Sequence, residues 1–274
     1  MRIACLVINR NLPKVTDRLV ESCLESKVCD EADIYVVEAG SDKDKMSSYQ
    51  RLVNREPLVI REGLRFNRGV NYGLAQLMEK GSLKYYDAVA CMTNDTEFLS
   101  RDVIGTLTSE LEKHSRLGIL SPCNDSWGEA TLLREERLKY FWHIQSSIYL
   151  FRVDFIMDVA IAEEDYSRGF FLDGTNFRGY MSETELIAKG YANGWASGIC
   201  ADASVREEES YLINKADLIR TDTFDENLRL YLEEGRAWLK KKYGFKSKWV
   251  MQMYSKAFYD KFFEYHPECA RYRL

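Results

Sequence analysis

Short apolar runs alternate with helically spaced apolar residues over the first 120 residues of the chain. Residues 3–8 (IACLVI) are apolar throughout, which is typical of a strand buried on both faces. In residues 14–26 the apolar side chains recur at the spacing of one helical face. The same criteria predict strands at residues 33–41, 58–60, 86–95 and 117–122, and helices at 71–78 and 102–113. Strands that alternate with helices indicate an α/β fold with a mostly parallel, Rossmann-like sheet flanked by helices.

The second half of the chain has a different pattern. Residues 140–151 (YFWHIQSSIYLF) predict a strand in a mixed part of the sheet, and residues 182–192 predict a short helix with a serine N-cap. The composition of residues 222–265 is helical, with a break at a glycine. We therefore expect one α/β domain over residues 1–210 and a helical C-terminal extension over residues 211–274.

Polar clusters follow three of the predicted strands, at the point where each strand ends. They are Asn9-Arg10-Asn11, Glu38-Ala39-Gly40-Ser41 and Thr93-Asn94-Asp95. Open α/β sheets bind ligands at the carboxyl ends of their strands. The pattern therefore predicts a ligand site at this edge, although strand-end polar residues also serve simply as turn formers.

Composition excludes several classes of protein. The net charge of -5 gives no global argument for a nucleic-acid binder. No apolar run approaches the roughly 18–20 residues that span a bilayer. The apolar run near the start of the sequence is too short for the core of a signal peptide. We therefore expect a cytoplasmic protein. Its seven cysteines form no C-x-x-C pair, which favours buried thiols over a zinc site or disulfides.

Four segments, in order, resemble one protein family. The most informative contains Asn67, Gly69, Asn71 and Gly73 and, after an apolar strand, Thr93-Asn94-Asp95-Thr96. The others are VVEAGSDKD from residue 36, ETELIAKGYANGW from residue 183 and CADASVREE from residue 200. Over residues 3–210 the chain resembles family-two-type glycosyltransferases of the GT-A fold, in particular their rhamnosyltransferase-like branch. The resemblance implies transfer of a hexosyl or deoxyhexosyl group from a nucleotide-sugar donor to a hydroxyl acceptor.

The resemblance also implies which residues bind the donor. Glu38 corresponds to the carboxylate that holds the nucleoside, and Asn9 and Asn11 would lie beside the base. Arg65 and Arg68 flank the glycine segment and are candidates for diphosphate contacts. Asn94 or Thr93 would line the sugar or ribose, and Asn71 belongs to the motif that precedes the strand. The full set of predicted donor-binding residues is Asn9, Asn11, Glu38, Arg65, Arg68, Asn71, Thr93 and Asn94.

A divalent cation and a general base complete the implied site. Mn²⁺ or Mg²⁺ would offset the charge of the leaving diphosphate, and hard cations prefer oxygen ligands such as Asp95. Glu207 stands where the family often has a metal-binding histidine. Glu183 aligns with the base that deprotonates the acceptor in an inverting transfer, and Glu185 is the second candidate. Both glutamates also suit the first turn of a helix as capping residues.

Two other functions remain open at this point. A sugar-phosphate nucleotidyltransferase would also use such a sheet and a metal, but the chain lacks a glycine-rich loop after its first strand. A non-catalytic descendant that binds a carbohydrate or a partner protein is the other, because Ser182 and Glu183 stand where the family has a Glu-Asp pair. For the acceptor, a carbohydrate or glycolipid is the expectation from the family, and a nucleic acid is a minority alternative.

The C-terminal segment mixes lysines with tryptophan, tyrosine and phenylalanine. This composition fits an interfacial helix pair at the periphery of a membrane, an acceptor-binding cap, a nucleic-acid contact or a dimer surface. A plain helical packing extension, with lysines that reach out to solvent, fits it equally well.

Overall fold

The computed structural model of the protein describes residues 1–25, 32–125, 128–133, 136–161, 165–207 and 223–274. In this part of the chain, nine strands form one curled, mostly parallel sheet, in the order β3-β2-β1-β4-β8-β6-β9-β5, with β7 paired to β9. The strands are β1 (Ile3–Asn9), β2 (Ala32–Glu38), β3 (Gln50–Val53), β4 (Ala88–Thr93), β5 (Thr96–Phe98), β6 (Leu117–Asn124), β7 (Leu138–Tyr140), β8 (Ile148–Arg152) and β9 (Ala196–Glu207).

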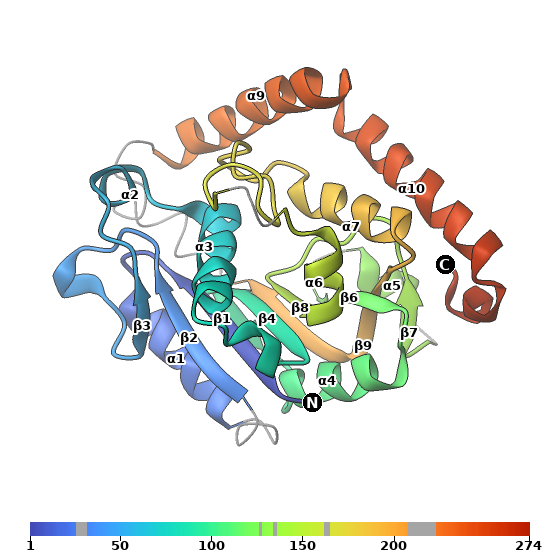
Figure 1. The fold of residues 1–274 in the computed structure, drawn as a ribbon, viewed down its shortest axis with the longest axis horizontal. Helices are drawn as coiled ribbons and strands as arrows, with labels where there is room; N and C mark the ends of the chain where they lie inside the picture. Colours follow the sequence, from blue (N-terminus) through green and yellow to red (C-terminus); the bar gives the residue numbers. More distant parts are fainter. Residues whose placement is uncertain (26–31, 126–127, 134–135, 162–164, 208–222) are drawn as a thin grey trace.

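Helices cover both faces of this sheet, with α3, α6 and α7 on one face and α1 and α4 on the other (Figure 1). The α-helices are α1 (Pro13–Leu24), α2 (Pro57–Glu62), α3 (Arg65–Glu79), α4 (Val103–Lys113), α5 (Glu129–Leu132), α6 (Val153–Val159), α7 (Ser182–Ala192), α9 (Phe224–Tyr243) and α10 (Lys248–Tyr265). The short 3₁₀ helices are η2 (Lys43–Lys45), η3 (Leu83–Tyr85) and η5 (Pro267–Tyr272).

The parallel half of the sheet brings the predicted strand ends together. Strand β1 is buried along its whole length and pairs in parallel with β2 and with β4. The register places Asn9 opposite Glu38 and Ile8 opposite Thr93. The three polar clusters therefore lie at one edge of the sheet, as predicted.

Two glycines of the α3 motif allow this helix to approach the sheet closely. A Cβ atom at Gly73 would lie 2.8 Å from a methyl of Leu6, and one at Gly69 would lie 2.9 Å from a methyl of Ile8. Such distances are shorter than carbon atoms tolerate in a packed core. The glycines thus set the position of α3 over β1.

The C-terminal helices pack against the α/β part of the molecule. Helix α10 lies along α7, and its residues Tyr259, Phe262 and Phe263 belong to the main hydrophobic core. Helix α9 forms a second, smaller core in which Trp238 and Leu239 contact Tyr180, Met181 and Met251. Gly244, at a φ of 73°, ends α9 in the left-handed conformation that glycine adopts readily. The predicted domain boundary near residue 210 lies outside the described residues.

Three sequence-based expectations are corrected by the structure. Residues 58–60 are in helix α2 rather than in a strand, because Pro57 starts a helix and only Val59 of this run is buried. The strand expected at 140–151 is two strands, β7 and β8, joined by residues 141–147. Helix α7 begins at Ser182, so its N-cap residue is Met181.

The six cysteines of the described chain are buried and free of disulfides. Of the described helices, none combines the length and the apolar character that a bilayer crossing requires.

Candidate active site

The side chain of Asn9 links the three strand ends. Its Nδ2 donates to both carboxylate oxygens of Glu38, at 3.0 and 2.9 Å. Its Oδ1 accepts from Thr16 Oγ1 at 2.9 Å, from Asn94 Nδ2 at 3.2 Å and from the Leu12 amide at 3.2 Å. Because Asn9 is fully buried, this network fixes the strand ends relative to one another.

Glu38, which belongs to this network, and Asn11, which lies next to it, are the two other residues predicted to bind the nucleoside. Glu38 is 1% exposed and also accepts the Ser47 amide at 2.8 Å, so its carboxylate anchors the chain that follows β2. Asn11 has a left-handed backbone, and its Oδ1 accepts the Asp42 amide at 2.8 Å. The Nδ2 of Asn11 is buried and has no hydrogen-bond partner among the described residues. It is thus a donor placed at the strand ends, where a ligand carbonyl would satisfy it.

Two asparagines of the α3 motif hold the loop that precedes α7. The carboxamide of Asn71 is fully buried and makes four hydrogen bonds to backbone groups of residues 166–172. That of Asn67 donates to the backbone carbonyls of Asp173 and Asn176, at 3.2 and 3.3 Å. In this arrangement Asn71 shapes the site through the loop, because its polar atoms are all engaged.

Arg65 and Arg68 lie on the same helix and point to the same loop. Their guanidinium carbons lie 5.4 and 4.7 Å from the centre of the Phe177 ring, within cation–π distance. Arg68 Nε also donates to the Gly174 carbonyl at 2.8 Å. Both arginines therefore contribute positive charge next to the predicted donor edge, although their observed contacts are with the loop.

A cavity of about 420 Å³ opens at the carboxyl edge of the sheet. It is lined by one predicted catalytic residue, one predicted donor-binding residue and one predicted metal ligand. Thr93, Glu183 and Glu207 come to it from β4, α7 and β9. Its lining residues are Phe66, Asn67, Thr93, Gln145, Ser146, Tyr149, Arg178, Gly179, Glu183, Glu207 and Tyr231. The cavity is the candidate active site.

Glu183 has the properties of a general base within this cavity. Desolvation by the surrounding side chains raises the pKa of its carboxyl to about 7, from 4.5 for an ordinary glutamate. A carboxylate with a pKa near neutrality accepts a proton far better than an exposed one. The geometry and the pKa both single out Glu183.

Glu185, the second candidate, has a different position. It is 2% exposed and accepts a hydrogen bond from Tyr243 and an ion pair from Lys242, at 2.5 Å. Lys242 also pairs with Asp173, which accepts a bond from Trp238 Nε1 at 3.0 Å. Glu185 thus fastens the end of α9 to the start of α7, whereas Glu183 lines the cavity.

The predicted metal ligands are brought near each other by the pairing of β5 with β9. Thr96 lies opposite Glu207 in this antiparallel ladder, and Asp95 directly precedes Thr96. Among the described residues no group of three or more His, Cys, Asp or Glu side chains is arranged to hold a metal. One or two carboxylates together with substrate phosphates are, however, the usual donor set for Mg²⁺. Asp95 and Glu207 stay the ligands that the sequence predicts for Mn²⁺ or Mg²⁺, and two carboxylates are compatible with such a donor set.

The structure adds residues to the site that the sequence motifs did not indicate. Tyr231 reaches the cavity from α9, and burial together with the nearby Glu183 raises the pKa of its phenol. Arg178 lines the same cavity and pairs with Glu234 of α9 at 3.0 Å. For Tyr231, only the aromatic and charged composition of the C-terminal segment pointed to such a contribution.

His143 and the neighbouring Trp142 do not line this cavity. His143 Nδ1 lies 2.8 Å from Thr184 Oγ1, and burial lowers its pKa to about 4. The ring is therefore neutral at physiological pH. Trp142 packs edge-on against Tyr259, at 5.2 Å between ring centres.

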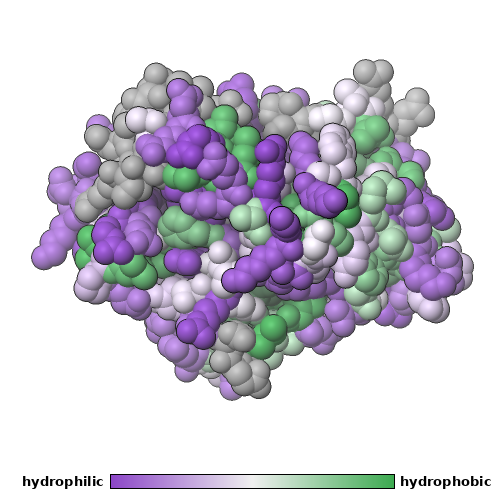
Figure 2. Space-filling view, turned by 90° about the horizontal axis from the view of Figure 1, so that it is seen from above, coloured by the Kyte–Doolittle hydropathy of each residue, from purple (hydrophilic) through white to green (hydrophobic). Residues whose placement is uncertain are grey.

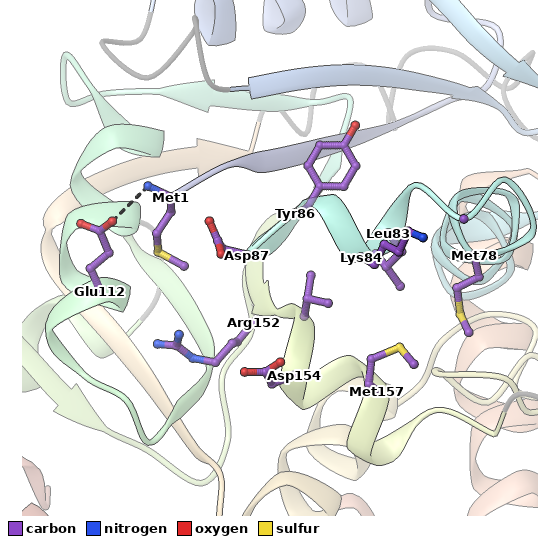
Figure 3. A pocket seen from close by; sticks show the side chains of 12 residues that line it. Met1, Met78, Leu83, Lys84, Tyr86, Asp87, Glu112, Arg152, Asp154 and Met157 are labelled. Carbon is purple, nitrogen blue, oxygen red and sulfur yellow. Dashed lines mark hydrogen bonds and ion pairs between the residues drawn. The ribbon is translucent and has the colours of Figure 1, made fainter.

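A larger cavity, of about 780 Å³, lies at the opposite edge of the sheet (Figure 3). Tyr86 and Asp87 line it from just before β4, and Arg152 from the end of the antiparallel β8. The guanidinium of Arg152 is engaged with backbone carbonyls at the end of α4, including that of Leu111 at 2.7 Å. Because this cavity contains none of the predicted catalytic residues, its size does not make it the active site.

The strand order and the flanking helices are those of the GT-A fold, and the chain is similar to solved structures of glycosyltransferases. The mannosyltransferase PcManGT from Pyrobaculum calidifontis, solved with GDP-Man and Mn²⁺, matches with a TM-score of 0.50 and 14% identity, over 95% of this chain and 86% of that one. Glucosyl-3-phosphoglycerate synthase from Mycobacterium tuberculosis, solved with Mn²⁺ and UDP, matches with a TM-score of 0.51 and 14% identity, over 88% and 78%.

GalNAc-T7, solved with UDP, GalNAc and Mn²⁺, matches with a TM-score of 0.55 and 10% identity, over 99% of this chain and 58% of that one. No family model matches the sequence, and neither does any curated protein. These likenesses show the fold. The rhamnosyltransferase-like branch stays a prediction from the sequence.

Proposed function

We propose that the protein is a glycosyltransferase that moves a sugar from a nucleotide-sugar donor to a hydroxyl acceptor, with inversion and with the help of a divalent cation. The observation that carries the proposal is the position of Glu183, whose pKa is about 7, in a cavity at the strand ends together with Thr93 and Glu207. The GT-A fold of the chain supports it, because the similar structures were solved with nucleotides and Mn²⁺.

In the proposed reaction, the acceptor hydroxyl gives its proton to the carboxylate of Glu183. The acceptor oxygen then forms a bond to the anomeric carbon, on the side opposite the departing group. The bond between that carbon and the diphosphate oxygen breaks, and the nucleoside diphosphate leaves with the electron pair. A cation held by Asp95 and Glu207 would supply Lewis-acid stabilisation of the diphosphate. The guanidinium groups of α3 would add positive charge on the same side.

The donor site is assigned to the strand ends, with Asn11 Nδ2 as a donor for a base or ribose oxygen. Glu38 and Asn9 would hold this edge in shape for the nucleoside, since they bond to each other. The hexosyl or deoxyhexosyl nature of the sugar, the acceptor and the cytoplasmic location belong to the proposal as the sequence suggested them.

A first experiment tests donor binding. The melting temperature of the purified protein is measured with a panel of nucleoside diphosphates and nucleotide sugars, with and without Mn²⁺. A ligand at about 100 times its Kd adds roughly 2.7 kcal/mol of stability. We expect one nucleotide to stabilise the protein in a Mn²⁺-dependent way, and Asp95→Asn to remove the Mn²⁺ dependence. If no nucleotide stabilises the protein, the donor site is wrongly assigned.

A second experiment separates catalysis from binding. Glu183→Gln should lower donor hydrolysis and transfer by about 10²–10⁴-fold, the usual contribution of a general base. The same variant should keep the nucleotide-dependent stabilisation, because Glu183 does not hold the donor. A protein that binds the nucleotide sugar but shows no turnover would be a non-catalytic binder, and release of pyrophosphate from a nucleoside triphosphate would indicate a nucleotidyltransferase.

A further inference from the structure

The junction of α9 and α10 is strongly basic. Residues 235–259, which we name the elbow, contain seven lysines and arginines and no acidic residue, in a chain whose net charge is -5. The basic residues are Arg236, Lys240, Lys241, Lys242, Lys246, Lys248 and Lys256. Lys242 is used in the ion pairs with Glu185 and Asp173, and Lys256 pairs with Asp260 at 2.5 Å.

The other five cations of the elbow are exposed, and no described acidic side chain lies within ion-pair distance of them. They are Arg236, Lys240, Lys241, Lys246 and Lys248. A concentration of positive charge on an otherwise acidic protein attracts polyanionic surfaces.

Next to these cations, α10 exposes a stripe of large apolar side chains. Trp249 is 65% exposed, Met253 62%, Val250 42% and Tyr254 38%. Their spacing of one and four residues places them on one side of the helix. The opposite side is already used, because Met251, on that side, is completely buried against α9. Helix α10 is therefore apolar on two sides, and only one of them is covered within the described chain.

The elbow lies on the periphery of the molecule, where α9 turns into α10 away from the sheet (Figure 1). Figure 2 looks onto this side and shows green and white atoms among purple ones at its right, the side of α10 in Figure 1. Exposed apolar surface that is rimmed by charge marks a binding surface.

We propose that the elbow docks onto the surface of an anionic phospholipid bilayer. Tryptophan and tyrosine prefer the headgroup region, where their apolar rings and polar atoms are both satisfied. Valine and methionine gain from contact with the acyl boundary, and lysines attract anionic headgroups. Trp249, Val250, Met253 and Tyr254 with the surrounding cations supply all of these groups on one surface. The proposal does not depend on the proposed enzymatic function.

Two other occupants fit the surface less well. A second copy of the chain, joined through the same surface about a two-fold axis, would bring two basic elbows together without acidic partners. A nucleic acid would match the positive charge, but Val250 and Met253 would then lie against a sugar-phosphate backbone, which offers them no apolar partner.

The test measures how much of the purified protein sediments together with phospholipid vesicles. No nucleotide is added. We expect binding to vesicles of equal parts phosphatidylcholine and phosphatidylglycerol, weaker binding at high salt, and little binding to phosphatidylcholine alone. The double variant Lys246→Gln/Lys248→Gln should weaken the binding by about 30-fold, since each lysine near an anionic surface contributes about fivefold. Trp249→Ser/Met253→Ser should also weaken it, at unchanged melting temperature.

A matched control carries Leu58→Ser and Met157→Ser, two apolar residues that are 48% and 54% exposed on other helices, and should bind like the parent. Equal binding to neutral and anionic vesicles, or equal binding of the parent and both elbow variants, would overturn the proposal. So would a dimer of the parent that the Trp249→Ser/Met253→Ser variant loses, or an elbow-dependent affinity for a single-stranded oligonucleotide without any for vesicles.

Discussion

Replacing Glu183 by glutamine should make the folded protein more stable at alkaline pH, although we expect the same change to slow sugar transfer strongly. Desolvation raises the pKa of this carboxyl from 4.5 to about 7 in the folded state. The folded protein therefore binds this proton more tightly than the unfolded chain does. The stability that comes from the protonated carboxyl is fully present below pH 4.5 and is lost as the pH rises through about 7.

The magnitude follows from the two pKa values. The difference between 4.5 and about 7, at 1.36 kcal/mol for each pH unit, corresponds to about 3 kcal/mol above neutrality. Glutamine has nearly the same shape and no charge to desolvate, so it keeps the packing and avoids this cost. We expect the variant to exceed the parent by up to about 3 kcal/mol at about pH 8 and to match it at about pH 4.

The assay is urea unfolding of both proteins at the two pH values, with the midpoint and slope compared. Glu185→Gln is the matched control on the same helix. Its carboxylate is paired with Lys242 at 2.5 Å, so neutralising it should destabilise the protein at alkaline pH. If Glu183→Gln changes stability equally at both pH values, or lowers it at alkaline pH, the carboxyl is not desolvated and its proposed role as base loses its physical support.

Three further predictions rest on the same structure. In the proposed reaction, kcat/KM should rise with pH and level off above an apparent pKa of about 7, because Glu183 must be ionised to accept a proton; a profile that is flat between pH 5 and 8 would contradict this. Lys242→Met should cost about 3 kcal/mol in urea unfolding, because it leaves the largely buried Asp173 without its cation and Glu185 with only Lys189, at 3.8 Å; a loss below about 1 kcal/mol would mean that the clamp is weak. Gly73→Ala should destabilise by overpacking, by about 1–3 kcal/mol, whereas Gly190→Ala on α7, whose added methyl would meet its nearest neighbour at 3.4 Å, should be neutral or stabilising.

The fold class could be predicted from local patterns in the sequence. Strand β1 is a continuous apolar run because both its faces are covered by helices, and continuous runs are read directly from a sequence. The glycines of α3 could be recognised as a motif, but their role could not. Only the packed structure shows that Gly69 and Gly73 face the side chains of β1 at distances that exclude a Cβ atom.

The strand-end clusters were predicted correctly as neighbours, because parallel strands bring their carboxyl ends to one edge. Which of their atoms remain available to a ligand depends on contacts that no local pattern encodes. Both polar side-chain atoms of Asn9 form hydrogen bonds, with Glu38, Asn94 and helix α1. The Nδ2 of Asn11, in contrast, is buried and has no hydrogen-bond partner among the described residues.

The sequence by itself thus determined an α/β sheet with polar residues at the carboxyl ends of β1, β2 and β4, because periodicity and turn composition act over a few residues. Only the tertiary structure shows that Glu183 and Glu185 lie in different surroundings. These two glutamates are two residues apart on one helix, yet one lines the cavity and the other meets Lys242, 57 residues further along the chain. The environment of each carboxylate is made by elements distant in sequence, so no local pattern distinguishes these two glutamates.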